Sequence, residues 1–384
     1  MRVAVIADSH FHEHKRFEEC QRLHDWIFED CSRRGVDLVL HAGDVFETKS
    51  SEKERLVAFS WFQRMASLAH VIVVRGNHDR VSELPALAKL EVQHSITVVE
   101  ESAVVEAAGA LVACVSWPRK AALLAAAGIE SRADAECLVG DALRDVFRGL
   151  GDELAEHEGP KMLLMHAMVR GSATSSGQPL IGAEMEVGLE DLALARADAY
   201  FLGHIHKSQA WSIGEAPVIY PGDPRRTDFG EREAKGYVVA EWDDAGVFVG
   251  WEFVEVPATP MVAIEGEWSD EDSLCGIAID LDDFERVRGA EVRLRYTTPH
   301  QFRVEARRHA DELRGILVDH GAVLVQIEPR VLPEQRERAE TIPTRATRAE
   351  QLDAYWKAKS FEPGERRPAL VAKLARIEER HHAA

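Results

Sequence analysis

The chain has 384 residues, 46% of them hydrophobic and 29% charged, which exceeds the usual size of one domain and excludes a disordered or fibrous protein. Its 46 basic and 66 acidic side chains give a formal net charge of −20, so an evenly spread surface charge would repel DNA and any DNA contact must be local. No apolar run approaches the roughly 18 residues that cross a membrane, and the opening residues do not form a secretory signal, so we expect a cytoplasmic protein with no membrane contact.

Short β-type runs alternate with helix-type stretches over the first two thirds of the chain, a pattern typical of a layered α/β domain. Apolar residues at helical spacing predict crossover helices over 17–33 and 54–69. Acidic and glycine residues at 243–246 predict a turn between antiparallel strands. The strands expected are 3–7, 38–41, 71–75, 111–116, 162–166, 200–203, 218–220, 236–242 and 247–255. We assign residues 1–256 to this first domain.

A stiff boundary follows at residues 257–260, because each of its two prolines removes an amide donor and restricts the residue before it. A second domain of about 70 residues is expected after it, over 261–330. Apolar residues alternate over 292–296, helical spacing follows over 304–320, and a further strand is expected over 322–327. These elements predict a small α/β domain.

The last part of the chain differs in charge from the acidic body, since residues 334–384 carry 11 basic and 9 acidic side chains. Residues 331–348 are rich in charge, contain two prolines and lack an apolar face, which predicts a linker. Residues 349–384 predict two short amphipathic helices, and their separation from the body favours a partner-binding tail over packing on the protein itself. The apolar faces comprise Leu352, Tyr355 and Trp356 in the first helix and Leu370, Leu374 and Ile377 in the second.

Potential metal ligands follow several of the predicted strands. Loops that leave the carboxyl ends of strands in an α/β sheet converge on one crevice, so residues far apart in sequence share a site there. Carboxylate, imidazole and amide oxygen suit manganese, iron or zinc. The five cysteines are widely spaced and none forms a C-x-x-C pair, which argues against a thiolate site. The residues concerned are Asp8, His10, Asp44, Asn77, His78, Asp79, His166, His204 and His206.

The series D-x-H, G-D, G-N-H-D, H and G-H-x-H, in that order, resembles the signature of the calcineurin-like metallophosphoesterases. The resemblance narrows to the SbcD-type nucleases of double-strand-break repair through the segments 43–46, 203–209, 220–224 and 228–231. It extends over nearly the whole chain. It implies an α/β fold in which a metallophosphoesterase β-sandwich is flanked by helices, followed by a small α/β domain that caps DNA and a helical C-terminal tail.

The resemblance also implies a site for two divalent metal ions, with Mn²⁺ as the expected metal. Two such ions, roughly 3.5 to 4 Å apart, hold a phosphodiester, stabilise its developing charge and lower the pKa of a bound water. His78 would face the phosphate as general acid or charge stabiliser, and Asp79 would position it. The implied ligands are Asp8, His10 and His206 for one ion, Asn77, His166 and His204 for the other, and Asp44 as the bridge.

Two residues depart from the family pattern. Glu47 stands where archaeal and eukaryotic relatives usually have a histidine linked to exonuclease action, and an acid there favours the bacterial branch. Asp223 replaces the serine common in the family's P-G-S-P segment, which adds a negative charge where a small hydroxyl is expected. The effect of this change on a phosphate contact at Asp223 stays open at this point.

We interpret the chain as a DNA nuclease with exonuclease and endonuclease action in DNA repair or recombination. The resemblance implies an SbcC-like coiled-coil ATPase as partner and a homodimer of the nuclease subunit within a heterotetramer. This chain contains no G-x-x-x-x-G-K-[ST] nucleotide-binding loop of its own. The candidates for contacts with DNA phosphates are Arg80, Arg170, Lys207, Arg225 and Arg226, which follow site motifs.

Two other functions stay open at this point. A metallophosphoesterase of small phosphodiesters would share the motifs, but it would not need the long extension after residue 256. A metal-binding DNA scaffold without turnover would share the ligands, but the presence of His78 argues against it. A nuclease assay separates these alternatives.

Overall fold

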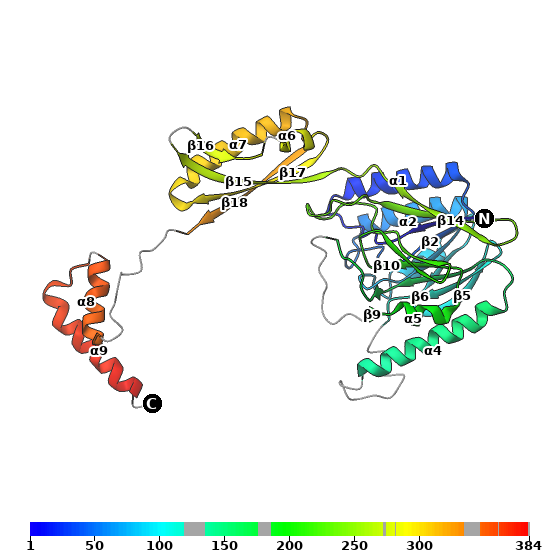
Figure 1. Cartoon of the computed structure of the whole chain (residues 1–384), viewed down its shortest axis with the longest axis horizontal. Coiled ribbons are helices and arrows are strands. Elements are labelled where there is room, and N and C mark those ends of the chain that lie inside the picture. Colours follow the sequence, from blue (N-terminus) through cyan, green and yellow to red (C-terminus); the bar gives the residue numbers. More distant parts are fainter. Residues whose placement is uncertain are drawn as a thin grey trace. The chain divides into compact units, whose positions relative to one another are not determined.

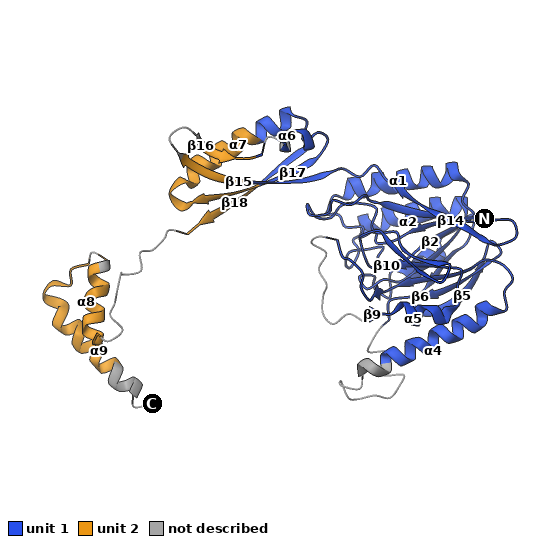
Figure 2. Cartoon of the chain, viewed as in Figure 1, with its two compact units in different colours: residues 1–265, 280–294, 314–327 blue, residues 266–279, 295–313, 328–384 orange. Residues whose placement is uncertain are grey.

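The computed structural model describes residues 1–118, 135–175, 186–271, 274–280, 282–333, 346–359 and 361–382. Most of the predicted linker over 331–348 lies outside these residues. The chain divides into two compact units, coloured in Figure 2: one comprises 1–265, 280–294 and 314–327, and the other 266–279, 295–313 and 328–384. The predicted limits of the domains, at residues 256 and 330, stay predictions. No helix in the described ranges is both long and apolar enough to cross a membrane.

Two six-stranded sheets form the body of the first unit (Figure 1). In the first sheet the strands of the N-terminal half run parallel, and the hairpin that closes it pairs antiparallel through β13 with β1. Its order is β14 (Phe248–Glu255), β13 (Gly236–Trp242), β1 (Arg2–Ile6), β2 (Leu38–His41), β3 (His70–Val74) and β4 (Ile96–Val99). This sheet contains the predicted crossovers, so both helices and the hairpin are confirmed.

The second sheet has a parallel centre and antiparallel edges, with β7 paired in parallel to β6 and β10. Its order is β11 (Gln209–Ile213), β12 (Ala216–Tyr220), β10 (Ala199–Gly203), β7 (Lys161–His166), β6 (Ala110–Val115) and β5 (Ser102–Ala107). The short strands β8 (Met168–Val169) and β9 (Glu186–Val187) pair with each other. The expected strands β6, β7 and β10 are confirmed to within a residue at each end.

The two sheets pack face to face between helices, which gives four layers. Alternate residues of each strand point to opposite faces: in β1, Val3 and Val5 enter the core between the sheets, while Ala4 and Ile6 face the helices. The helices α1 (Phe17–Arg34) and α2 (Glu52–Leu68) cover the first sheet, and α4 (Ala135–Ala155) and α5 (Leu189–Leu192) cover the second. The predicted helix-flanked β-sandwich is confirmed.

Local signals fix the limits of the helices. At the start of α2 the Ser51 hydroxyl accepts a hydrogen bond from the Glu54 amide at 3.2 Å, and the Glu54 carboxylate accepts one from the Ser51 amide at 2.8 Å. This reciprocal pair satisfies two amides that the helix leaves unpaired. Helix α1 ends at Gly35, whose φ of 62° lies in the left-handed region that glycine adopts without strain.

The remaining strands form a four-stranded sheet in the order β16 (Leu274–Ala278), β15 (Met261–Glu271), β17 (Glu291–Pro299) and β18 (Leu324–Leu332). Every second residue of β17 is buried, as the alternation over 292–296 predicted. Helices α6 (Asp283–Arg286) and α7 (Arg303–Asp319) belong to the same region. Strand β18 begins two residues later than predicted and continues five residues past the predicted end at 327, where its residues are mostly exposed and hydropathy gives little signal.

The tail forms two helices, α8 (Arg348–Ala358) and α9 (Arg367–His382), which contact each other. Thr347 caps α8 through a reciprocal bond pair with Glu350. Trp356 is 8% exposed and its ring lies 6.4 Å from that of Phe361, so it packs within the tail. Of the predicted apolar faces, Tyr355, Leu370 and Ile377 are exposed, at 51%, 36% and 51%, and Phe361 beside them is 53% exposed. Both predicted helices are confirmed.

Candidate metal centre

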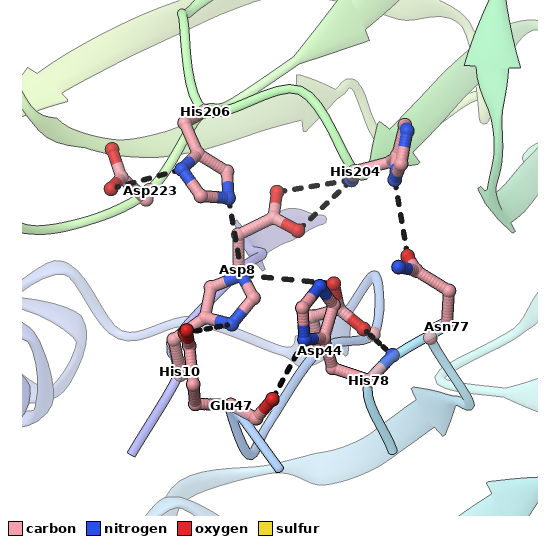
Figure 3. Close-up of polar contacts among 12 residues, drawn as sticks. Asp8, His10, Asp44, Glu47, Asn77, His78, His204, His206 and Asp223 are labelled. Atoms are coloured by element: carbon pink, nitrogen blue, oxygen red, sulfur yellow. Dashed lines mark hydrogen bonds and ion pairs between the residues drawn. The ribbon is translucent and has the colours of Figure 1, made fainter. Parts of the chain in front are cut away.

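The residues expected as ligands lie at or just beyond the carboxyl ends of β1, β2, β3, β7 and β10. Several of them take backbone conformations that are rare for residues other than glycine: Asp8, Asp44 and His204 have φ values of 52°, 53° and 105°. A conformation of this kind costs roughly 1 to 3 kcal/mol and persists where the surrounding structure imposes it. The sharp turns direct these side chains toward one another (Figure 3).

One cluster contains Asp8, His10 and His206, whose ligand atoms all lie within 4.8 Å of one another. The Nε2 atoms of His10 and His206 are 3.1 Å apart, although 196 residues separate them in the sequence. The Asp8 carboxylate accepts hydrogen bonds from the His204 amide at 2.9 and 3.1 Å, which orients it. All three side chains are buried or nearly so. Two imidazole nitrogens and a carboxylate that converge in this way fit one divalent cation.

A second cluster contains Asp44, His166 and His204, with Asn77 between the two rings. The Asn77 Oδ1 atom lies 2.8 Å from His166 Nε2 and 3.1 Å from His204 Nδ1. His166 Nδ1 donates to the carbonyl of Ala42 at 2.7 Å, which holds the proton on Nδ1 and leaves Nε2 as the ligand atom. These donors fit a second cation.

Asp44, a member of the second cluster, also faces the first. Its Oδ2 atom lies 3.4 Å from His166 Nε2 and 3.6 Å from His10 Nε2, while its Oδ1 atom accepts a hydrogen bond from the His78 amide at 2.9 Å. A single carboxylate oxygen therefore faces ligands of each cluster. This geometry is the one that a bridging ligand between two metal ions requires.

Glycines allow the strands to come this close. A Cβ atom on Gly76 would lie 2.0 Å from Asp44 Oδ1, and one on Gly203 would lie 2.1 Å from the carbonyl oxygen of Ala42. No side chain fits at either distance. Glycine is thus required at Gly76 and Gly203 by close approach, not by an unusual φ.

The protonation of the clusters also favours cations. Burial raises the pKa of Asp8 to about 6, and the neighbouring Asp44 charge adds to this rise. Burial has the opposite effect on His206, because it disfavours the charged imidazolium and holds the pKa well below its usual range. The His206 ring is therefore neutral, and its lone pair is available. Burial would lower the pKa of His166, but the adjacent Asp44 carboxylate raises it to about 9. A proton therefore compensates the buried Asp44 charge, and a divalent cation would take over that role.

His78 lies at the edge of the site, partly exposed, with its ring 5.0 Å from that of His10. Its Nδ1 atom donates to the carbonyl of Glu47 at 2.7 Å, which leaves Nε2 for other contacts. Asp79 was expected to hold this ring. Its carboxylate accepts instead from the amides of Phe46 at 3.0 Å and Gly76 at 2.9 Å, and no bond to His78 occurs among the described residues. Asp79 therefore shapes the loop backbone, and the carbonyl of Glu47 holds the ring.

The Glu47 side chain contacts the first cluster. Its Oε2 atom lies 3.1 Å from His10 Nδ1, and its Oε1 atom lies 2.5 Å from the ammonium of Lys15. Both contacts lower the pKa of Glu47, and the contact with His10 has the larger effect. Glu47, the acid that departs from the family pattern, is therefore a charged partner of the candidate ligand His10.

The basic residues proposed for DNA differ in exposure. Arg225 is 1% exposed, and its guanidinium donates to the carbonyls of His10 at 2.5 Å and Lys15 at 2.6 Å. Its predicted DNA contact is therefore wrong, because a buried guanidinium bonded within the protein does not reach a phosphate. Arg226 is partly buried and donates to the carbonyl of Glu233 at 2.9 Å. Of the others, Arg80 is exposed, Lys207 is half-buried, and Arg170 is ion-paired.

Sequence reasoning missed three residues near the clusters. Glu231 and Lys235 lie with Asp223 behind His206, and both are 1% exposed. Both residues lie in a polar segment, and the sequence around them does not predict that they are buried. Trp117 places its ring 4.9 Å from that of His204, tilted by 35°. The only signal for Trp117 was its position directly after a predicted strand.

Comparisons with known proteins show which family the chain resembles. The model of the calcineurin-like phosphoesterase superfamily domain matches residues 1–245. The D component of the nuclease SbcCD of Escherichia coli (strain K12) is 25% identical over 287 residues, which cover 70% of this chain and 71% of that protein. The DNA double-strand break repair protein Mre11 of Methanosarcina mazei is 23% identical over 257 residues, 64% of this chain and 37% of that protein. Among solved structures, a dimetal phosphatase from Danio rerio is 12% identical, covers 67% of this chain and 97% of its own, and has a TM-score of 0.44.

Proposed function

We propose that this chain, which belongs to the calcineurin-like phosphoesterase superfamily, is a DNA nuclease that hydrolyses phosphodiester bonds at a site for two divalent metal ions, Mn²⁺ foremost. The observation that carries the proposal is the Asp44 carboxylate oxygen, which faces ligands of both clusters. DNA as substrate, and an SbcC-like ATPase as partner in repair or recombination, are supported by the names of the two curated relatives.

The charge of the site suits a phosphodiester. Asp8 and Asp44 are the two carboxylates of the clusters, and the remaining proposed ligands are imidazoles and one amide. Two divalent cations would outweigh these two negative charges and leave a positive field within an otherwise acidic protein. An anionic substrate would therefore be attracted to the site despite the net charge of the chain.

The metal ions, when bound, supply a Lewis acid for the phosphate and lower the pKa of water. The protein residues have distinct tasks beside them. Asp44 would be a ligand common to the two clusters. His78 keeps Nε2 available because its Nδ1 atom donates to the carbonyl of Glu47. We assign to His78 the transfer of a proton to the leaving oxygen.

A cleavage assay tests the proposal. Purified protein should cut linear and hairpin DNA in the presence of Mn²⁺ and should lose this activity in excess EDTA. Hydrolysis of bis-p-nitrophenyl phosphate without DNA cleavage would favour an enzyme of small phosphodiesters. Binding of two Mn²⁺ without hydrolysis of either substrate would favour a metal-binding scaffold.

DNA binding should depend on a few local cations. We expect weak binding to duplex DNA with a salt slope of about 0.9 for each phosphate that a basic side chain neutralises. Arg80 and Lys207 are the accessible candidates, so the Arg80→Ala/Lys207→Ala variant should lower the slope by up to about 1.8. Fluorescence anisotropy at several salt concentrations measures it. Arg148→Ala, on the exposed face of α4, is the matched control, and an unchanged slope in the double variant would remove both residues from the DNA surface.

The tail should bind the partner without supporting the nuclease. A chain that ends at residue 333 is expected to stay folded, retain metal-dependent cleavage of simple substrates and fail to bind the ATPase. Tyr355→Ala should weaken that binding by about 2 kcal/mol, roughly thirtyfold, because exposed aromatic residues often dominate an interface. Trp356→Ala should act by disrupting the tail itself, since Trp356 is buried there. A lower melting temperature of the shortened nuclease would instead indicate that the tail packs on its own body.

A further inference from the structure

The segment after β12, residues 221–235, carries charged side chains that are almost wholly buried. Asp223, Arg225, Glu231 and Lys235 are each 1% exposed. Charged groups are costly to bury unless they are paired, and they are seldom buried without a specific role. Neither a DNA contact nor a place among the proposed metal ligands accounts for these four residues.

This segment contacts the loops of two candidate ligands of the same cluster. The Arg225 guanidinium spans the carbonyls of His10 at 2.5 Å and Lys15 at 2.6 Å. The Asp223 amide donates to the carbonyl of His206 at 3.2 Å, and Asp223 Oδ2 lies 3.7 Å from His206 Nδ1 (Figure 3). The segment therefore holds the backbone of both ligands and faces the ring of His206.

Lys235 fixes the direction of the Asp223 carboxylate. Its ammonium lies 2.6 Å from Asp223 Oδ1 and 2.9 Å from Glu231 Oε2. The lysine charge therefore lies between these two carboxylates, where a further metal ion would otherwise fit. Asp223 Oδ2 receives no hydrogen bond from the residues that the structure describes, and it is the oxygen nearest to the imidazole. A carboxylate behind a ligating imidazole sets the orientation of the ring and makes it a better donor.

We propose that Asp223 and Arg225 are positioning residues that align His206 and His10 for one of the two metal ions. The other cluster is aligned differently, because the carbonyl of Ala42 holds the ring of His166. The two sites should therefore respond separately to changes in this segment. The inference rests on the proposed function in one respect, since it requires two ion sites.

Isothermal titration calorimetry of the whole chain with Mn²⁺ alone tests this inference. Wild-type protein should bind two ions. Asp223→Asn keeps the shape of the side chain and removes its charge, so one ion should bind about 10- to 100-fold more weakly while the other binds as before. Raised Mn²⁺ concentrations should restore cleavage, because affinity is lost rather than the fold. If Asp223→Asn fails to fold, Arg225→Lys is the second variant. It alters the contact with the carbonyl of His10, so it should weaken the binding of the same ion.

A double-mutant cycle identifies which site weakens. Asp223→Asn should lower Mn²⁺ affinity no further in a His206→Ala background, but should have its full effect in a His166→Ala background. Asp30→Asn is the matched control: Asp30 is 4% exposed and ion-paired with Arg34, so its loss should reduce stability and leave Mn²⁺ binding unchanged.

The outcomes separate this inference from the proposed function. Equal weakening of both ions in Asp223→Asn, or no weakening in either variant, would overturn the positioning role. Wild-type protein that bound fewer than two ions would overturn both proposals. Wild-type protein that bound two ions with the predicted pattern but cut no DNA would support the positioning role and refute the nuclease.

Discussion

Replacing Asp44 with alanine should abolish DNA cleavage and weaken the binding of both metal ions together. Its Oδ2 atom is 3.4 Å from His166 Nε2 and 3.6 Å from His10 Nε2, so both clusters lose a ligand at once. Removal of one group that stabilises developing charge typically costs about 100- to 1,000-fold in rate, and a group shared by two ions should exceed that loss. Calorimetric Mn²⁺ titration and a gel assay of the same preparation measure the two effects.

Melting experiments provide an independent check on the Asp44 variant. Ligands that bind only the folded state stabilise it by mass action, so Mn²⁺ should raise the melting temperature of the wild type and have little effect on Asp44→Ala. Asp44→Asn is the companion variant, because asparagine tolerates the φ of 53° better than alanine does. Asp145→Ala, at an exposed position in α4, is the control for the loss of an aspartate. Retention of two tightly bound ions by Asp44→Ala would contradict the bridge.

Replacing His78 with alanine should have the opposite signature: both ions stay bound and turnover falls by about 100- to 10,000-fold. Its ring contacts the carbonyl of Glu47 and the edge of the His10 ring, and it belongs to neither ligand set that we propose. If His78 protonates the leaving oxygen, the loss should be smaller for a p-nitrophenyl ester, whose leaving group needs no proton. Rates on DNA and on bis-p-nitrophenyl phosphate give the comparison.

Metal analysis decides the role of His78. His94→Ala, at an exposed position outside the clusters, serves as the histidine control and should match the wild type in both Mn²⁺ content and rate. If His78→Ala lost its metal as completely as Asp44→Ala, or lost the same factor on both substrates, His78 would not be the proton donor.

Local patterns in the sequence were sufficient for much of the fold and for the chemistry of the site. The pattern of short apolar runs predicted β1, β2, β3, β7 and β10 within a residue or so, because strands buried on both faces form continuous apolar runs. It missed β5 and β11, which lie at the edges of the second sheet and are mostly half-buried or exposed, so hydropathy gives little contrast there. The donor groups of the proposed site could be read directly, since each motif is a few residues long and follows a strand.

The tertiary structure alone decided which groups meet. His10 and His206 are 196 positions apart, and no local signal gives the 3.1 Å between their Nε2 atoms. Arg225 has the sequence context of a surface cation, yet the fold buries it against the carbonyl of His10. Side-chain type and local spacing determine what a residue is able to do, whereas its partners depend on contacts between distant segments, which form only when the two sheets pack. Short motifs therefore indicated the family and the types of donor group, whereas the contacts of Asp79, Asp223 and Arg225 follow from how distant segments pack together.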